Sequence, residues 1–467
     1  MDGPNKPGHD DAPFDRAAHP SHEILTAAVD SPHGMKIIPV PAEKTAEAGS
    51  ARAMKTADPE LMRAINRFHV MDAIRRLGPV SRVEICELTE LSPTTVSAIT
   101  AALLDDRLII PLQVGALRDA GRGRPRVMLK LNPEAAHVVG VKLAPDQITV
   151  AVTNFCADLV CSLAMPIRID RQTAAVIADL VEDGVRRCVS DAGLELADVS
   201  GMCVGLPGVV ERAAGICRQS PIFRERDVPF GANLSQRLGV ATSIDSDVNL
   251  VTLAEHWFGQ ARYLNDFLVV NVERSLGLGI LHNGELFRGA NGLSPDLGDF
   301  MVRPPSNGGG RLADVATEAS VIGEADAFLS GAEREAVLTP VRLMAAILRR
   351  ADEGDTRCAR VLAAAGEALG FAIANLIALF APPKVIISGG AMATSEHFVA
   401  PLRKTVAHLL PASLADVSDI VVREWSGGDW LRGAAAMTLR DLYGAPWGTT
   451  GPAPLRNAYS LELGETP

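Results

Sequence analysis

The chain is 467 residues long and 47% hydrophobic, which excludes a single small domain and is ample for a large core. Its formal net charge of −11 excludes a protein that coats nucleic acid over its whole surface, so any DNA contact would be confined to a locally basic module. Seven cysteines without a CxxC pair, no apolar run of membrane-spanning length and no signal-peptide pattern at the N-terminus predict a soluble, cytoplasmic protein.

The N-terminal part of the chain changes character near residue 58. Residues 1–57 are rich in Pro, Ala, His and Asp and have no sustained period, which predicts a disordered tail. Residues 59–132 carry eleven basic side chains against eight acidic ones, so this segment is positive within a negative chain. It begins with an apolar stripe at helical spacing, which predicts a first helix from Glu60 to Gly78-Pro79. The stripe is Leu61, Ile65, Val70, Ile74 and Leu77.

Two further helices are predicted after this stop. The second runs from about Ser81 to Thr89, and a turn then leads to Ser92 and Pro93, a good N-cap followed by proline in the first helical turn. The third helix runs to about Asp105. Its apolar residues would pack inward, so its short polar residues, with no acid among them, would face outward and suit a DNA major groove. The inward set is Val96, Ile99 and Leu103, and the outward set is Thr94, Ser97 and Ala98.

The apolar runs at 108–110 and 127–129 could form the two strands of a wing. Between them, Gly121 to Arg126 reads GRGRPR, and arginines on a slim, extended segment fit a narrow minor groove. Residues 58–132 are thus predicted to form a winged helix-turn-helix DNA-binding domain. A protein-interaction module is the alternative for the domain, and a solvated basic linker is the alternative for the GRGRPR segment. The predicted DNA contacts are Ser81, Arg82, Ser92, Thr94, Thr95, Ser97, Arg122, Arg124 and Arg126.

From about Ala136 the pattern becomes α/β. Strand-like and helix-like runs alternate, and two α/β halves imply two lobes with a cleft between them. The predicted strands are 138–143, 148–153, 202–205, 267–272 and 385–388, and the predicted helices lie near 173–191, 361–379 and 431–443.

Four segments of this region resemble the ROK family of repressors, open reading frames and sugar kinases. The run from Asp247 to Glu255 is similar to the family's N-D-A-N-x-x-x-x-x-E segment, and residues 205–210, GLPGVV, are similar to its sugar-pocket loop. The other two are residues 383–390, PKVIISGG, and 433–436, GAAA. The resemblance implies a two-lobed, actin-like ATPase (ribonuclease H-like) sugar-kinase fold over residues 133–445, followed by a C-terminal tail at 446–467.

The resemblance also shows where this chain departs from the family's kinases. The first phosphate turn, D-x-G-G-T in the family, reads KLAPD from Lys142 to Asp146, and the second, G-T-G-I-G, reads ERSLG from Glu273 to Gly277. The first turn loses both glycines and Pro145 removes a donor, and the second places a carboxylate and an arginine where the triphosphate should approach. These losses argue against ATP binding and predict no cofactor. Asp247 stands at the position of the kinase base, but we expect no catalytic residue. Its expected role is to accept a hydrogen bond from a sugar hydroxyl.

The family's zinc ligands are replaced as well. The segments that match the family's G-E-I-G-H motif and cysteine loop read PDLGD at 295–299 and NGGGRL at 307–312, without histidine or cysteine, so no metal is predicted. The same changes alter the implied sugar contacts. The expected effector-binding residues are Gly208, Ser246, Asp247, Asp296 and Asp299. A different sugar, a non-sugar ligand and no ligand remain open.

Together these features predict a DNA-binding transcriptional regulator, a repressor of carbohydrate-related genes. Its partners would be a double-stranded DNA operator, a small sugar effector and a second copy of the chain, as a homodimer or tetramer. It would act in the cytoplasm at the nucleoid, without a membrane partner. The alternatives are a sugar kinase that keeps Asp247 as its base and a regulator that takes no ligand.

Overall fold

A computed structural model describes residues 59–112, 127–294, 296–303, 310–328, 340–424 and 429–443. The predicted tails at 1–57 and 446–467, and the arginines Arg122, Arg124 and Arg126, lie outside these ranges.

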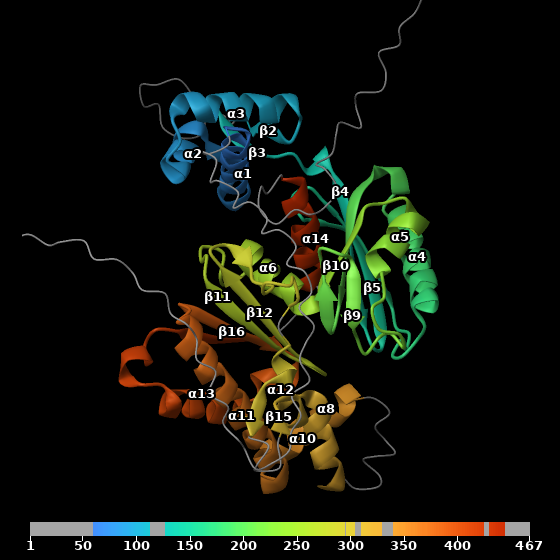
Figure 1. The fold of residues 1–467 in the computed structure, drawn as a ribbon, viewed down its shortest axis with the longest axis vertical. Coiled ribbons are helices and arrows are strands. Elements are labelled where there is room, and N and C mark those ends of the chain that lie inside the picture. Colours follow the sequence, from blue (N-terminus) through green and yellow to red (C-terminus); the bar gives the residue numbers. More distant parts are fainter. Residues whose placement is uncertain are drawn as a thin grey trace, which may run out of the picture. The chain divides into compact units, whose positions relative to one another are not determined.

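The first part of the described chain, residues 59–131, contains the predicted helices α1 (Pro59–Leu77), α2 (Arg82–Thr89) and α3 (Pro93–Asp105). Strands β1 (Val80–Ser81), β2 (Ile109–Leu112) and β3 (Met128–Leu131) form an antiparallel sheet in the order β1-β3-β2. We call this part the head (Figure 1). The GRGRPR segment therefore belongs to the connection between two paired strands, as a wing requires.

Local chemistry explains where the helices of the head begin. The Ser81 side chain accepts from the Glu84 N–H at the start of α2, and the Glu84 side chain accepts from the Ser81 N–H in return, a capping box. At α3, the Ser92 hydroxyl accepts from the Thr95 N–H at 3.1 Å. The helices bury an apolar core that includes Val70, Ile74, Ile85, Val96 and Leu103. The two outer members of the predicted α1 stripe, Leu61 and Leu77, are exposed instead.

The remaining residues form two five-stranded sheets of the same topology. In the first sheet the order is β10-β7-β4-β5-β6, with β4 pairing in parallel with β7 and β7 with β10, and β5 and β6 antiparallel. In the second the order is β13-β12-β11-β16-β17, with β11, β16 and β17 parallel and β12 and β13 antiparallel. These strands are β4 (His137–Ala144), β5 (Gln147–Asn154), β6 (Leu159–Met165), β7 (Val199–Leu206), β10 (Thr242–Ser246), β11 (Phe267–Val272), β12 (Leu276–His282), β13 (Glu285–Leu286), β16 (Lys384–Gly389) and β17 (Asp419–Glu424).

Helices cover both sheets (Figure 1). Helices α4 (Ala174–Asp191) and α5 (Phe230–Leu238) share a core with the first sheet, and α10 (Pro340–Asp352), α11 (Thr356–Phe380) and α13 (Glu396–Leu409) share one with the second. The smaller elements are η1 (Pro133–Ala135), η2 (Leu196–Asp198), β8 (Val209–Glu211), β9 (Ile216–Gln219), η3 (Leu297–Asp299), β14 (Met301–Arg303), β15 (Gly310–Arg311), α7 (Ala313–Ala316), α8 (Glu318–Ala325), η5 (Asp326–Phe328), α12 (Ala391–Thr394) and η6 (Ala412–Leu414).

Helices α6 (Asp247–Phe258) and α14 (Asp429–Leu442) pack against each other between the two sheets, α14 on β4 and β7 and α6 on β11 and β12. A side chain at Gly433 would place its Cβ 2.0 Å from the Leu250 carbonyl oxygen, so only glycine permits this approach. The same apolar core continues into the head and includes Val70, Ile74 and Trp257.

One sequence expectation about membranes needs correction. Helix α11 is long and apolar enough, by length and composition alone, to cross a membrane. In the most apolar stretch of this helix, 56% of the residues are buried. Three of its residues, Leu369, Ile373 and Ile377, belong to the core beneath the second sheet. A buried core helix of a globular domain passes the same test of length and composition.

Candidate DNA-binding head and effector cavity

The outer face of α3 carries short polar side chains. Thr94, Ser97 and Ala98 are exposed, Thr95 is half-buried, and Val96 and Leu103 point into the core. Ser92 is exposed, but its hydroxyl is engaged with Thr95, with the two side-chain oxygens 2.9 Å apart. Thr94 and Ser97 are therefore the predicted α3 contacts best placed to meet a base edge or a phosphate.

Two predicted DNA contacts at the start of α2 have structural roles. Ser81 is only 2% exposed and caps α2, so the expectation that its side chain meets DNA is corrected. Arg82 is half-buried, and its Nε donates to the Thr100 hydroxyl at 2.8 Å, which ties α2 to α3. The sequence alone could not reveal these contacts, because Ser81 satisfies the same pattern whether its hydroxyl caps the helix or meets a phosphate.

The five predicted effector residues line one cavity of about 490 Å³. Gly208 follows β7, Ser246 and Asp247 lie where β10 meets α6, and Asp296 and Asp299 come from η3. Gly208 has φ 113°, and a Cβ there would lie 2.2 Å from the Gln219 carbonyl oxygen, so the loop requires glycine. The size is within the range of small-molecule sites.

Asp247 lies at the N-terminus of α6, where its Oδ1 accepts from the Val248 N–H at 2.8 Å. Desolvation raises the pKa of Asp247 to about 6 although the nearby Lys142 lowers it, and Glu273 adds to the increase. Desolvation also raises the pKa of Asp296, whose Oδ1 accepts from the Gly298 N–H at 2.9 Å. With a pKa of about 6 the ionised form of Asp247 still predominates at neutral pH, so its carboxylate can accept a hydrogen bond from a ligand hydroxyl.

The structure also contains a buried ionic network that was not predicted from the sequence. Asp245, fully buried at the end of β10, pairs with Arg288 at 2.6 Å and with Arg212 at 3.8 Å, and accepts from the Asn249 amide at 2.6 Å. Burial alone would raise the pKa of Asp245, but the two guanidiniums outweigh it and lower that pKa. The signal in the sequence was an acid two residues before Asp247, but its partners are distant in the chain.

Three arginines of the cavity wall were also missed. Arg171, Arg224 and Arg226 are exposed and lie in loops around the cavity that includes Asp247. They come from two separate loops, and no motif in the sequence connects them.

Charged side chains also occupy the segments that match the family's phosphate turns. Lys142 Nζ on β4 lies 3.9 Å from Glu273 Oε2, which follows β11. Glu318 begins α8 nearby, and burial and the proximity of Glu273 raise its pKa to about 7. Two acidic side chains, one of them paired with Lys142, therefore lie close together at these segments.

The residues that match the family's zinc segment do not fit a zinc site. Arg311 pairs with the carboxylate of Asp299, so a guanidinium holds one of the few oxygen ligands present. Within the described ranges, no group of three His, Cys, Asp or Glu side chains could hold a metal ion.

Comparison with known proteins supports one family. A family model described as "ROK family" matches residues 138–441. The chain belongs to the ROK family. It is 27% identical over 360 residues to the "Xylose repressor" of Caldicellulosiruptor bescii, covering 74% of this chain and 88% of the relative. It is 26% identical over 335 residues to the "DNA-binding transcriptional dual regulator NagC" of Escherichia coli K12, covering 71% and 81%.

Solved structures confirm the expected actin-like fold. A crystal structure of a ROK family transcriptional regulator, described as a homolog of the E. coli MLC protein, matches with a TM-score of 0.69 at 22% identity, covering 83% of this chain and 98% of that one. A ROK family glucokinase from Streptomyces griseus, in complex with glucose and AMPPNP, matches with a TM-score of 0.54 at 22% identity, covering 65% and 99%. The regulator matches a larger share of this chain than residues 138–467 make up, so its match extends into the part before residue 138, where the head lies.

Proposed function

We propose that this ROK protein is a DNA-binding transcriptional regulator, a repressor of carbohydrate-related genes, that acts in the cytoplasm at the nucleoid. The observation that carries the proposal is the extent of the match to the solved ROK regulator, which reaches into the head, whereas the glucokinase covers only 65% of this chain. The names of the repressor relatives support the same function.

In this proposal the head binds the operator through two elements. Thr94 and Ser97 on α3 read the major groove, and Thr95 and Ser92 support them at the start of that helix. Arg122, Arg124 and Arg126 enter the minor groove from the connection between β2 and β3. A homodimer or a tetramer presents two heads to a roughly palindromic operator.

The ROK domain then serves as a sensor of a small polyol and not as a kinase. A cavity of suitable size is lined by Asp247, Ser246, Gly208 and Asp296. In this cavity Asp247 accepts a hydrogen bond from a sugar hydroxyl. A triphosphate would meet the side chains of Glu273 and Arg274 where the family's kinases place glycine N–H groups, which supports a non-catalytic role. A ligand that binds one lobe arrangement more tightly than the other can shift operator affinity.

The direct test is to sequence genomic fragments that the purified full-length protein retains at near-physiological salt. The proposal expects a few palindromic peaks. Featureless retention that disappears with added salt would mean that only counterion release drives binding, and would contradict a specific regulator.

A sugar kinase is the second candidate, because the fold matches a ROK glucokinase and Asp247 stands at the base position. Transfer of phosphate from ATP to glucose, xylose or N-acetylglucosamine, lost in Asp247→Asn, would establish it.

A regulator that takes no ligand is the third candidate. The melting temperature with each of the same three sugars tests it, since a ligand that binds only the folded state must raise the melting temperature.

A further inference from the structure

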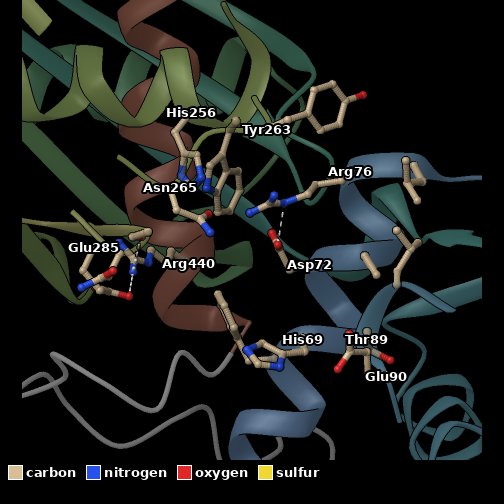
Figure 2. Close-up of a pocket in the computed structure, with 17 residues that line it drawn as sticks. His69, Asp72, Arg76, Thr89, Glu90, His256, Tyr263, Asn265, Glu285 and Arg440 are labelled. Atoms are coloured by element: carbon tan, nitrogen blue, oxygen red, sulfur yellow. Dashed lines mark hydrogen bonds and ion pairs between the residues drawn. The ribbon is translucent and has the colours of Figure 1, made fainter. Parts of the chain in front are cut away.

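A second cavity, of about 480 Å³, lies where the head meets the ROK domain (Figure 2). One wall is formed by α1 and the end of α2, including Phe68 and Asp72. The opposite wall is formed by the end of α6, the β12–β13 turn and α14, including His256 and Arg440. None of the predicted effector residues lines this cavity, so it is separate from the effector cavity.

His256 is the unusual group in this wall. It is 5% exposed, and within the described part of the chain neither of its ring nitrogens has a hydrogen-bond partner. Burial lowers the pKa of His256 to about 3, and Arg76 and Arg75 lower it further, so the ring is neutral. A buried imidazole with an unmet donor and an unmet acceptor destabilises the folded protein. A bound molecule would remove this destabilisation.

The charges around His256 indicate the kind of molecule. Asp72 is an acid whose charge acts on the ring, and it is shared by two arginines, with Arg75 at 2.7 Å and Arg76 at 2.6 Å. Arg440, whose charge also lowers the pKa of His256, pairs with Glu285 at the β12–β13 turn. Three guanidiniums thus surround the imidazole, while Glu90, the remaining carboxylate of the wall, is exposed. The potential at the buried end favours a negative charge.

We propose that the cavity between α1 and the end of α6 is a second binding site, which takes a small organic oxyanion through the unpartnered ring of His256. An oxyanion, either a phosphate ester or a carboxylate, accepts the imidazole N–H and is stabilised by Arg76 and Arg440. The cavity volume exceeds what a single inorganic ion needs, so the anion belongs to a larger molecule. Because the ligand touches both walls, its binding changes how firmly the head is held.

The site is connected to the effector cavity by one rigid element. Asp247, at the first residue of α6, lines the effector cavity, and His256 and Trp257, near the last residue of α6, line the second cavity. A movement of α6 in response to one ligand would therefore reach the other. Such coupling is reciprocal.

The test is calorimetric titration of the full-length protein with inorganic phosphate, glucose 6-phosphate and citrate at matched ionic strength. Saturable binding of at least one of these anions is expected. Glucose 6-phosphate without citrate would assign a phosphate ester, and the reverse would assign a carboxylate. No binding of any anion would overturn the proposal, because solvent alone would then satisfy His256.

Two variants of His256, with a control outside both cavities, test the assignment. His256→Phe fills the same space without ring nitrogens, so it should fold at least as stably as the wild type and bind the anion at least tenfold more weakly. His256→Gln, which keeps a donor and an acceptor, should bind in between and serves if the phenylalanine variant does not fold. Arg63→Ala, on the exposed face of α1 and outside both cavities, should bind the anion unchanged. Equal binding by the wild type and His256→Phe would contradict the assignment.

Discussion

Asp247 is the residue whose ionisation state the fold controls most clearly at the effector cavity. Its pKa is raised from 3.8 to about 6, so the folded state favours the protonated form. The stability that Asp247 contributes is therefore complete below about pH 4 and is lost as the pH rises through 6. This shift of the pKa corresponds to a change of at most about 3 kcal/mol in the free energy of unfolding.

We predict that Asp247→Asn matches the melting temperature of the wild type at pH 4 and exceeds it at pH 7.5, because asparagine resembles the protonated acid. Thermal unfolding of both proteins across this range measures the effect. A constant difference at all pH values would show that Asp247 is solvated in the folded protein.

At the residue scale, the sequence predicted the effector cavity better than the head. The ROK motif brought Gly208, Ser246, Asp247, Asp296 and Asp299 together because each lies at the end of a strand or helix that the family pattern fixes. It could not find Asp245 with Arg288, since such a pair depends on the tertiary fold.

At the element scale, the close contact between α6 and α14 can be tested by adding a single methyl group at Gly433. Gly433→Ala would place a Cβ against the Leu250 carbonyl, and we predict a loss of about 1–3 kcal/mol. The matched control is Gly323→Ala on α8, where no atom lies within 4 Å of the added Cβ. That change should stabilise the helix by up to about 1 kcal/mol, and thermal unfolding reports both. Equal melting temperatures would contradict the described contact of α6 with α14.

The two segments that we propose to bind DNA should fail in different ways. Arg122→Ala with Arg124→Ala should weaken binding mainly at A·T-rich flanks and reduce the salt slope by about two. Ser97→Ala or Thr94→Ala should instead change which sequences are preferred. Operator titrations at several salt concentrations measure the first effect, and selection from random sequences measures the second. An unchanged salt slope would return the GRGRPR segment to a linker.

At the element scale, period and capping predicted α1, α2, α3 and the central strands of both sheets. The buried strands β4, β7, β11 and β16 are continuous apolar runs, which are easy to recognise. Strands such as β6 and β17 were missed because the first is largely exposed and the second is half-buried, so their apolar signal is weak.

In the whole molecule, a cationic contact above an aromatic stack adds to the shared apolar core that holds the head on the ROK domain. The Arg75 guanidinium lies 4.1 Å from the centre of the Trp257 ring, and Trp257 stacks on Tyr443 with ring centres 5.5 Å apart. Arg75 also donates to the Trp257 carbonyl at 3.3 Å. Arg262 adds a hydrogen bond to the Arg76 carbonyl.

We predict that Arg75→Ala loosens the head, because it removes a cation–π contact of about 0.5–2 kcal/mol and a hydrogen bond. Amide hydrogen exchange in α1, α2 and α3 should become faster. Arg63→Ala, on the exposed face of the same helix, is the control and should leave exchange unchanged. Equal protection in both variants would show that the apolar core alone holds the head.

The central claim is that the effector cavity of the ROK domain and the DNA-binding head act as one regulator. The most direct measurement is the operator affinity of the full-length protein with and without xylose, glucose and N-acetylglucosamine, in the wild type and in Asp247→Asn. The account predicts that at least one sugar changes the wild-type affinity about fivefold or more and leaves the Asp247→Asn affinity unchanged. Specific operator binding that no sugar alters, or a sugar effect that persists in Asp247→Asn, would contradict it.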